Sequence, residues 1–303
     1  MIPVSSLSSQ EVRNYFPDLI PPNLLTWNID MSNDELKLFF SEPVNTTTFN
    51  FSALTLQSDK NLLPSTVSVS LDKSASIKSF AINNGIYSIV IKISENDANL
   101  IKSTPPLCQG KVSCFLTISP TLCFDTSTFT IDSKKNSIEF KNRITTFQPT
   151  YDCDIFTPDT TSPTLKSYTI DMNTGKLKLQ FSEPVIFNTF DASGIIFRNT
   201  SSGSTYKLSS NSYPSDLSLQ NITVTFSLID FVNLKVKQIA ASINNVFLQL
   251  TTSSCKDIAG NAISLMLSPI PPVLFFADVT PPEILAVAFS RKINIDNKYP
   301  FKK

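Results

Sequence analysis

The chain has 303 residues, of which 41% are hydrophobic and 17% charged, so its composition is that of folded domains rather than of a disordered segment. The 25 basic and 25 acidic residues cancel, which removes the net positive field that attracts nucleic acid or acidic membranes. Histidine is absent, which excludes histidine-based nucleophile systems and histidine zinc sites.

The first predicted elements belong to a repeat. Residues 18–44 read DLIPPNLLTWNIDMSNDELKLFFSEPV and residues 159–185 read DTTSPTLKSYTIDMNTGKLKLQFSEPV, with 14 of 27 positions identical. A third copy begins at Asp278 with DVTPPEIL. Self-similarity at this spacing predicts an array of one module. The expected organisation is a tail or the end of a preceding module at 1–17, domains at 18–158 and 159–277, and a shortened third copy at 278–303.

Alternating apolar residues predict strands in each copy. Leu36, Leu38 and Phe40 alternate with their neighbours, as their counterparts do in the second copy, and a period of two fits strands with one face on a core. Further strands are expected at 54–57, 66–71, 87–93, 195–199, 222–228 and 246–251. Short helices are expected near 95–101 and 230–238. Many short strands in tandem predict an all-β fold of immunoglobulin-like β-sandwiches.

Five cysteines suggest disulfides in an oxidising compartment. The spacing does not fix their pairing. Local loop closure favours Cys108–Cys114 and Cys123–Cys153, the latter in a loop insertion of the first domain, which leaves Cys255 unpaired. The alternative is five reduced thiols in a cytosolic protein.

Three motifs occur in a fixed order in the second copy: Asp-x-Thr-x-Pro at 159–163, Leu-x-Leu-x-Phe-Ser-Glu-Pro-Val at 177–185 and Asp-x-Ala-Gly-Asn at 257–261. Their order resembles the bacterial-type Ig-like repeats of S-layer proteins and large surface adhesins, over most of residues 18–290. The resemblance implies an extracellular spacer or adhesion module without catalytic activity. The first copy departs from it by lacking the Gly-Asn turn, and the third by carrying Ser290 where Asp30 and Asp171 stand in the others.

Acidic residues recur at matched positions of the copies. From the strand directions, we expect them to lie at the two opposite ends, or poles, of each domain. Glu183 and Asp257 are expected to gather with Asp159 at the N-terminal pole of the second domain. Stacking of the domains would add oxygen ligands from the first domain, namely Asp30, Asp97 and Asn99. Calcium prefers such oxygen-rich sets, so we hypothesise a calcium ion at the interdomain junction; no other cofactor is expected.

Two other interpretations of these acids stay open. Aspartate is a common turn and cap residue, so structural turns explain the same pattern. A Glu183/Asp257 pair has the chemistry of a glycoside hydrolase, but Trp27 is the only tryptophan and the second copy offers no such sugar platform. Trp27 and Tyr168 share one repeat position, which we interpret as a packed aromatic, with a carbohydrate-binding platform as the alternative.

These features predict a non-catalytic structural or adhesion module, a fragment of a longer extracellular repeat array. Its expected partners are neighbouring repeats and a cell-surface protein or glycan. Nucleic acid is not expected as a partner. The sequence has no run of 18 apolar residues, so membrane insertion of this segment is not expected. The N-terminus lacks a signal-peptide pattern, so signal and anchor are expected elsewhere in the parent chain. The alternative is a carbohydrate- or protein-binding accessory module of a larger secreted protein.

Overall fold

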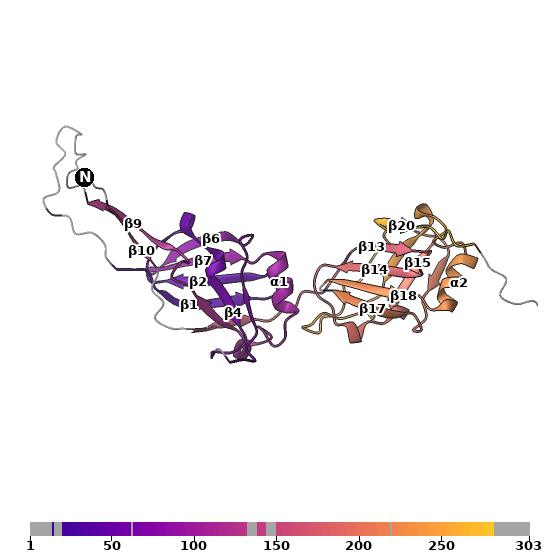
Figure 1. Ribbon diagram of the computed structural model, residues 1–303, viewed down its shortest axis with the longest axis horizontal. Coiled ribbons are helices and arrows are strands. Elements are labelled where there is room, and N and C mark those ends of the chain that lie inside the picture. Colours follow the sequence, from indigo (N-terminus) through magenta and orange to yellow (C-terminus); the bar gives the residue numbers. More distant parts are fainter. Residues whose placement is uncertain are drawn as a thin grey trace, which may run out of the picture.

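The computed structural model describes residues 14, 20–61, 63–131, 138–143, 150–218 and 220–281. Nearly all of the predicted tail at 1–17 and the third copy beyond Pro281 lie outside this part of the chain. Within it there are five β-sheets and two α-helices, which confirms the all-β prediction. No described helix is long and apolar enough to cross a membrane. Figure 1 shows two β-rich units joined end to end by a narrow connection.

The first unit has two main sheets and a smaller third one. Their strand orders are β12-β1-β2-β7-β6, β11-β8-β4-β5 and β10-β9-β3. The strands are β1 (Leu24–Asp30), β2 (Glu35–Phe40), β3 (Val44–Asn45), β4 (Leu54–Gln57), β5 (Ser68–Ser70), β6 (Ser76–Asn83), β7 (Ile86–Lys92), β8 (Phe115–Ile118), β9 (Phe124–Ile131), β10 (Ile138–Arg143), β11 (Tyr151–Asp152) and β12 (Ile155–Thr157). One helix, α1 (Glu95–Lys102), follows β7.

The second unit repeats this arrangement with fewer strands. Its sheets have the orders β17-β18-β14-β13-β20 and β16-β15-β19. The elements are β13 (Leu165–Asp171), β14 (Lys176–Phe181), β15 (Ile195–Arg198), β16 (Thr205–Lys207), β17 (Tyr213–Ser218), β18 (Asn221–Thr225), α2 (Leu228–Val236), β19 (Phe247–Leu250) and β20 (Leu274–Phe276). The helix again follows the fourth strand of the larger sheet in chain order, which is β18 here and β7 in the first unit.

Each unit has its own hydrophobic core. Buried residues between Leu24 and Cys153 form one cluster, and those between Tyr168 and Ile263 form the other. Leu36, Leu38 and Phe40 are fully buried, while the residues between them are partly exposed. The period of two read from the sequence is therefore the alternation between core and surface along β2.

Each unit ends in a strand that pairs in parallel with its first strand. Strand β12 runs beside β1, with Asn28 opposite Ile155, and β20 runs beside β13, with Thr169 opposite Leu274. The chain therefore leaves each unit at the turn between its first two strands. The helix begins at the same pole, since Ile93 donates a backbone hydrogen bond to Asp34. Figure 1 shows α1 at the end of the first unit that faces the second, and α2 at the far end of the second unit.

Several expected elements differ from the observed ones. Strand β4 matches its predicted range, whereas the strand expected at 222–228 ends at Thr225 because Ser227 caps α2 by accepting a hydrogen bond from the Asp230 backbone N–H, at 3.1 Å. Most of the edge strands, among them β6 and β17, were not predicted. β6 is exposed at nearly every position and therefore lacks an alternating pattern.

The cysteines pair only once among the described residues. Cys108 and Cys114 form a disulfide, as expected. The expected Cys123–Cys153 bond is not formed, and both residues are buried thiols, as is Cys255. Cys123 precedes β9 and lies near Tyr87, at the start of β7. The thiol of Cys153 donates to the Ile155 carbonyl at 3.2 Å, beside the middle of β1. The two thiols thus lie towards opposite ends of the core.

Candidate functional site

The candidate site is the junction between the units, and its central residue is Lys102. Helix α1 begins at Ser94, whose hydroxyl accepts a hydrogen bond from the Asp97 backbone N–H at 3.1 Å. Lys102 is the last residue of the helix, where a positive charge opposes the negative end of the helix dipole. Ile101, beside it, is fully buried and holds the helix against the first core.

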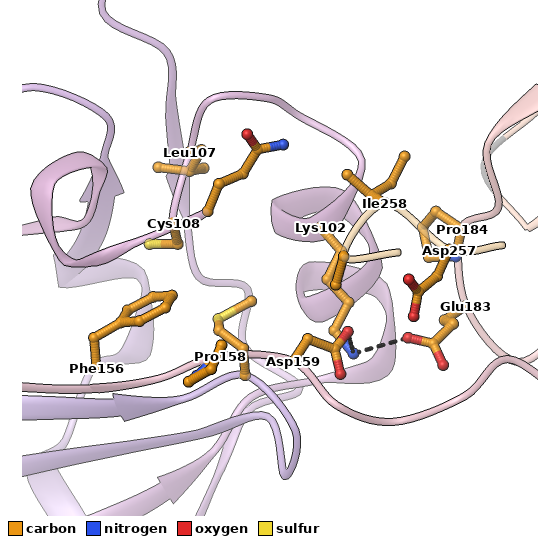
Figure 2. Close-up of a pocket in the computed structure, with 13 residues that line it drawn as sticks. Lys102, Leu107, Cys108, Phe156, Pro158, Asp159, Glu183, Pro184, Asp257 and Ile258 are labelled. Atoms are coloured by element: carbon orange, nitrogen blue, oxygen red, sulfur yellow. Dashed lines mark hydrogen bonds and ion pairs between the residues drawn. The ribbon is translucent and has the colours of Figure 1, made fainter. Parts of the chain in front are cut away.

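The ammonium of Lys102 lies among carboxylates of both units. Its Nζ is 3.0 Å from Asp159 Oδ2 and 3.1 Å from Glu183 Oε2. Asp34, in the turn between β1 and β2, contributes an ion pair at 3.3 Å. The side chains of Lys102, Asp159 and Glu183 are 10%, 8% and 5% exposed, so this network is mostly shielded from water. Figure 2 shows Lys102 reaching from α1 to these residues.

A third carboxylate of the second unit completes the cluster. Ligand atoms of Asp159, Glu183 and Asp257 all lie within 4.8 Å of one another. Asp257 is held by Asn261, whose backbone N–H and side-chain amide donate to it at 2.7 and 2.8 Å. The Asn261 amide also donates to the Asp159 carbonyl at 3.2 Å, so the Gly260-Asn261 turn ties the linker to this pole.

Burial, together with the neighbouring charges, changes the acid–base behaviour of the site. Burial raises the pKa of Glu183 to about 7, although Lys102 opposes this shift. Burial also raises the pKa of Asp257. For Lys102, burial alone would lower the pKa, but Asp34, Glu183 and Asp159 together raise it above its usual range. The lysine is therefore a permanent cation, and Glu183 is the group that titrates near neutral pH.

The structure brings together three of the five predicted calcium ligands. Asp159, Glu183 and Asp257 meet as expected, while Asp30 and Asp97 are placed elsewhere. Asp30 caps its own turn by accepting from the Ser32 and Asn33 backbone N–H groups at 2.9 and 3.0 Å. Asp30 is thus a turn residue, as the structural interpretation of these acids predicts.

Asp97 is buried at the start of α1 and accepts a hydrogen bond from the Asp72 backbone N–H at 2.7 Å. Its neighbour Asn99 is also buried. Lys102, the residue that does join the three acids, was not predicted. A signal for it existed, because both helices begin with Ser-x-x-Asp and carry a lysine five residues after that aspartate, Lys102 in one and Lys235 in the other.

The second unit repeats the same contact at its far end. Lys235 Nζ lies 2.6 Å from Asp278 Oδ2, and Asp278 occupies the position in its copy that Asp159 occupies in the preceding one. The turn contacts recur as well. Ser32 accepts a hydrogen bond from the Thr160 backbone N–H at 2.8 Å, and Asn173 accepts one from the Val279 backbone N–H at 3.3 Å. The start of one copy is thus bound by the helix pole of the copy before it.

An open cavity of about 270 Å³ lies at the first junction, beside Lys102. One side is apolar and belongs to the first unit; the other carries the carboxylates of the second (Figure 2). The apolar side is formed by Met31, Leu107, Phe156 and Pro158.

The aromatic pair at the shared repeat position is internal in both units. Trp27 is 0% exposed and its indole N–H donates to the Tyr151 carbonyl at 3.0 Å. Tyr168 is 1% exposed and donates to the Val246 carbonyl at 3.3 Å. The packed-aromatic interpretation is therefore correct, and neither ring is available as a carbohydrate platform.

Comparisons with known proteins add little to these observations. No protein-family model matches the chain, and no curated protein matches it. Among solved structures, the N-terminal part of the bacterial S-layer protein SbsC is similar at 17% identity and a TM-score of 0.24. This similarity covers 39% of the present chain and 24% of the S-layer structure, so it spans about a quarter of that structure's length.

Proposed function

We propose that the chain is a non-catalytic structural module in which Ig-like domains are joined at a defined angle to form a spacer of an extracellular surface protein. The larger sheet of the first unit contains the strand order β6-β7-β2-β1, with β12 added at the edge beside β1, and β4 and β8 pair in the opposite sheet. This is the order expected of an Ig-like sandwich, which has strands A, B, E and D on one sheet and C and F on the other.

The observation that carries the proposal is that two successive junctions use the same contact. A lysine at the end of each helix pairs with the aspartate that opens the next copy, Lys102 with Asp159 and Lys235 with Asp278. A contact that recurs at each junction belongs to the joining of modules, whereas a catalytic site needs a single constellation. The Cys108–Cys114 disulfide supports an oxidising, extracellular location.

We assign the role of the junction cation to Lys102 and keep calcium as the alternative. The ammonium already lies within 3.1 Å of Asp159 and Glu183, where a calcium ion would bind. Titration calorimetry with millimolar calcium is expected to give no heat with the wild-type chain. A stoichiometric calcium signal that stiffens the junction would overturn the assignment and restore calcium as the cation.

The spacer proposal is tested by residual dipolar couplings measured on both units of the intact chain. A fixed joint gives both units one alignment tensor, and Lys102→Met should give two. Lys235→Met is the matched control, because it removes the equivalent lysine from the other junction and should leave the tensors of the two units equal. Independent alignment of the wild-type units would contradict a spacer of fixed shape.

The alternative function, a carbohydrate- or protein-binding accessory module, is supported by the cavity beside Lys102, which combines apolar and acidic walls. Binding of the chain to a glycan array, lost on Glu183→Gln, would favour this alternative. Hydrolysis of a glycan by the purified chain would contradict the non-catalytic proposal.

A further inference from the structure

The exposed side of helix α2 carries an apolar stripe at the far end of the second unit. Leu228, Ile229, Val232 and Val236 are 76%, 62%, 47% and 74% exposed. Residues 228, 232 and 236 follow each other at intervals of four, so they lie on one face of the helix. Such an exposed stripe indicates a contact surface.

The equivalent positions of α1 are polar, and one of them, Glu95, already makes a contact between the units. Glu95, Asn96, Asn99 and Ser103 stand where the four apolar residues stand in α2. Glu95 forms an ion pair with Lys166, in the first strand of the second unit, and accepts a hydrogen bond from Gln220 at 3.1 Å. The first position of this set therefore meets the next copy at the first junction.

The partner of Glu95 has an informative counterpart in the third copy. Lys166 lies seven residues after Asp159, and Leu285 lies seven residues after Asp278. Glu95 and Leu228 are likewise each seven residues before the junction lysine of their helix. In the sequence of the next junction the positions of Glu95 and Lys166 are occupied by Leu228 and Leu285, so both positions change from charged to apolar together. A coupled change of this kind is the pattern that two residues in contact produce.

We propose that the apolar face of α2 is the docking surface for the segment that follows Pro281, with Leu285 packed on Leu228. Leu285 lies outside the described residues. The proposal rests on the proposed function to the extent that both assume junctions built alike. The first two contacts of this junction are already present, since Lys235 binds Asp278 and the Thr280 hydroxyl donates to Asn173 at 2.8 Å.

Reach and area both favour this occupant over a second chain. From Asp278 to Leu285 the chain spans up to about 23 Å, while Lys235 and Leu228 are about 10 Å apart along the helix. The stripe exposes on the order of 400 Å², about half of the 800 Å² per partner that a stable complex buries. A segment tied to the same chain needs less area, because the linkage supplies a high effective concentration.

The test is cross-linking of the full-length double variant Leu228→Cys/Leu285→Cys under mild oxidation. Leu228 is exposed, so its replacement should not disturb the fold, and the three thiols of the native chain are buried and should not compete. We expect an intramolecular disulfide that forms at least about tenfold faster than in the control Leu267→Cys/Leu285→Cys, as proximity requires. Leu267 is 87% exposed and belongs to the same unit.

Equal rates in the two variants would overturn the proposal, as would disulfide-linked dimers of Leu228→Cys/Leu285→Cys, which would identify a second copy as the occupant. A methyl NOE between Leu228 and Leu285 in the wild-type chain is the independent check, and its absence would also overturn the proposal. The dipolar-coupling test concerns the first junction, so failure of the spacer proposal and failure of this one give different results.

Discussion

Helices α1 and α2 occupy the same position in their units, yet the same residue types meet different surroundings in each. Asp230 is fully buried and accepts hydrogen bonds from Tyr206, Ser209, Ser212 and Ser227. Its counterpart Asp97 faces Asp72, which stands where Ser209 stands in the second unit. One aspartate is thus surrounded by donors, and the other has a second carboxylate beside it.

This difference reverses the direction of the two pKa shifts. Burial raises the pKa of Asp97, and the Asp72 charge adds to that shift. Burial also acts to raise the pKa of Asp230, but the hydrogen bonds from Ser212, Ser209 and Tyr206 outweigh it and the pKa is lowered. A repeated sequence position therefore stabilises the fold as an anion in the second unit, whereas in the first unit its ionisation opposes folding.

The largest expected effect follows from this contrast. Asp230→Asn replaces an acceptor oxygen by a donor facing hydroxyl groups and removes a stabilised buried charge, so we expect a loss of about 4 kcal/mol in the free energy of unfolding. Asp97→Asn keeps an acceptor for the Asp72 backbone and relieves repulsion, so its effect should stay within about 1 kcal/mol.

Urea unfolding followed separately in each unit provides the measurement. Fluorescence of Trp27, the only tryptophan, reports the first unit, and hydrogen exchange reports the second. Because the folded pKa of Asp230 is lowered, its contribution should be present above the unfolded pKa and disappear as pH falls through the folded pKa. Equal losses for the two variants would show that the surroundings do not distinguish the sites.

The next largest effect concerns the two junction lysines. Lys102→Met leaves the buried Glu183 and Asp159 without their cation, at an expected cost of about 3 kcal/mol. Lys235 is 37% exposed and pairs with the single carboxylate of Asp278, so Lys235→Met should cost less than about 1 kcal/mol. Differential scanning calorimetry measures both, and a cost for Lys235→Met as large as for Lys102→Met would refute the distinction.

The junction also shows which features could be predicted from the sequence. Asp159, Glu183 and Asp257 were predicted to meet because each lies next to a strand or a turn that the sequence identifies. The order of these strands shows at which end of the domain each acid lies. Asp30 and Asp97 were wrongly grouped with them because local hydrogen bonds occupy their carboxylates: Asp30 accepts from the Ser32 backbone N–H and Asp97 from the Asp72 backbone N–H. Lys102 was missed because lysine is an ordinary residue at the end of a helix, and only the comparison with Lys235 in the second helix marks it in the sequence.

The fold was predictable for a related reason. Buried strands such as β2 and β4 have a recognisable hydrophobic pattern because one face of each packs on the core. Strand β6 pairs only with β7 and is mostly exposed, so its sequence has no such pattern. The Cys123–Cys153 prediction failed because loop closure in sequence does not place two thiols on the same side of the core.

A third prediction concerns the loop after each helix. Cys108 and Ala240 occupy equivalent positions with φ of 48° and 64°, and each donates a matched backbone hydrogen bond, to Ser113 at 2.8 Å and to Asn245 at 3.0 Å. The partner of Cys108, Cys114, has Val246 as its counterpart. Only the first unit is cross-linked here.

The comparison can be tested by removing the disulfide from the first unit and introducing one at the equivalent positions of the second. Cys108→Ala/Cys114→Val should cost the first unit about 2 kcal/mol, the value for a short closed loop. Ala240→Cys/Val246→Cys should form a disulfide and add a similar amount to the second. Thermal unfolding with and without reductant tests both, and failure of the new pair to oxidise would show that the two loops are not equivalent.

The fourth prediction uses the titration of Glu183. Its folded pKa of about 7 exceeds the usual glutamate value of 4.5, so the folded state binds more protons between these values and stability falls as pH rises through that window. Glu183→Gln should flatten this slope, which we expect to amount to about 2 kcal/mol between pH 5 and 8. The test is the melting temperature of the wild-type chain and of Glu183→Gln, measured across that pH range. An unchanged dependence of the melting temperature on pH would assign the titration to another group.

The smallest effect converts the first junction into the second. Glu95 and Lys166 are 60% and 42% exposed, so their ion pair contributes at most about 0.5 kcal/mol and is screened by salt. Glu95→Leu/Lys166→Leu places leucine at both positions, as in the sequence of the next junction, and should leave the free energy of unfolding nearly unchanged while removing the salt dependence that the ion pair contributes. The single variant Glu95→Leu leaves Lys166 unpaired and should retain less rigidity in dipolar couplings than the double variant. If the single and double variants behave alike, the two positions do not act as a pair, and the contact between copies depends on the lysine–aspartate bond and on the turn contacts such as that of Ser32 with Thr160.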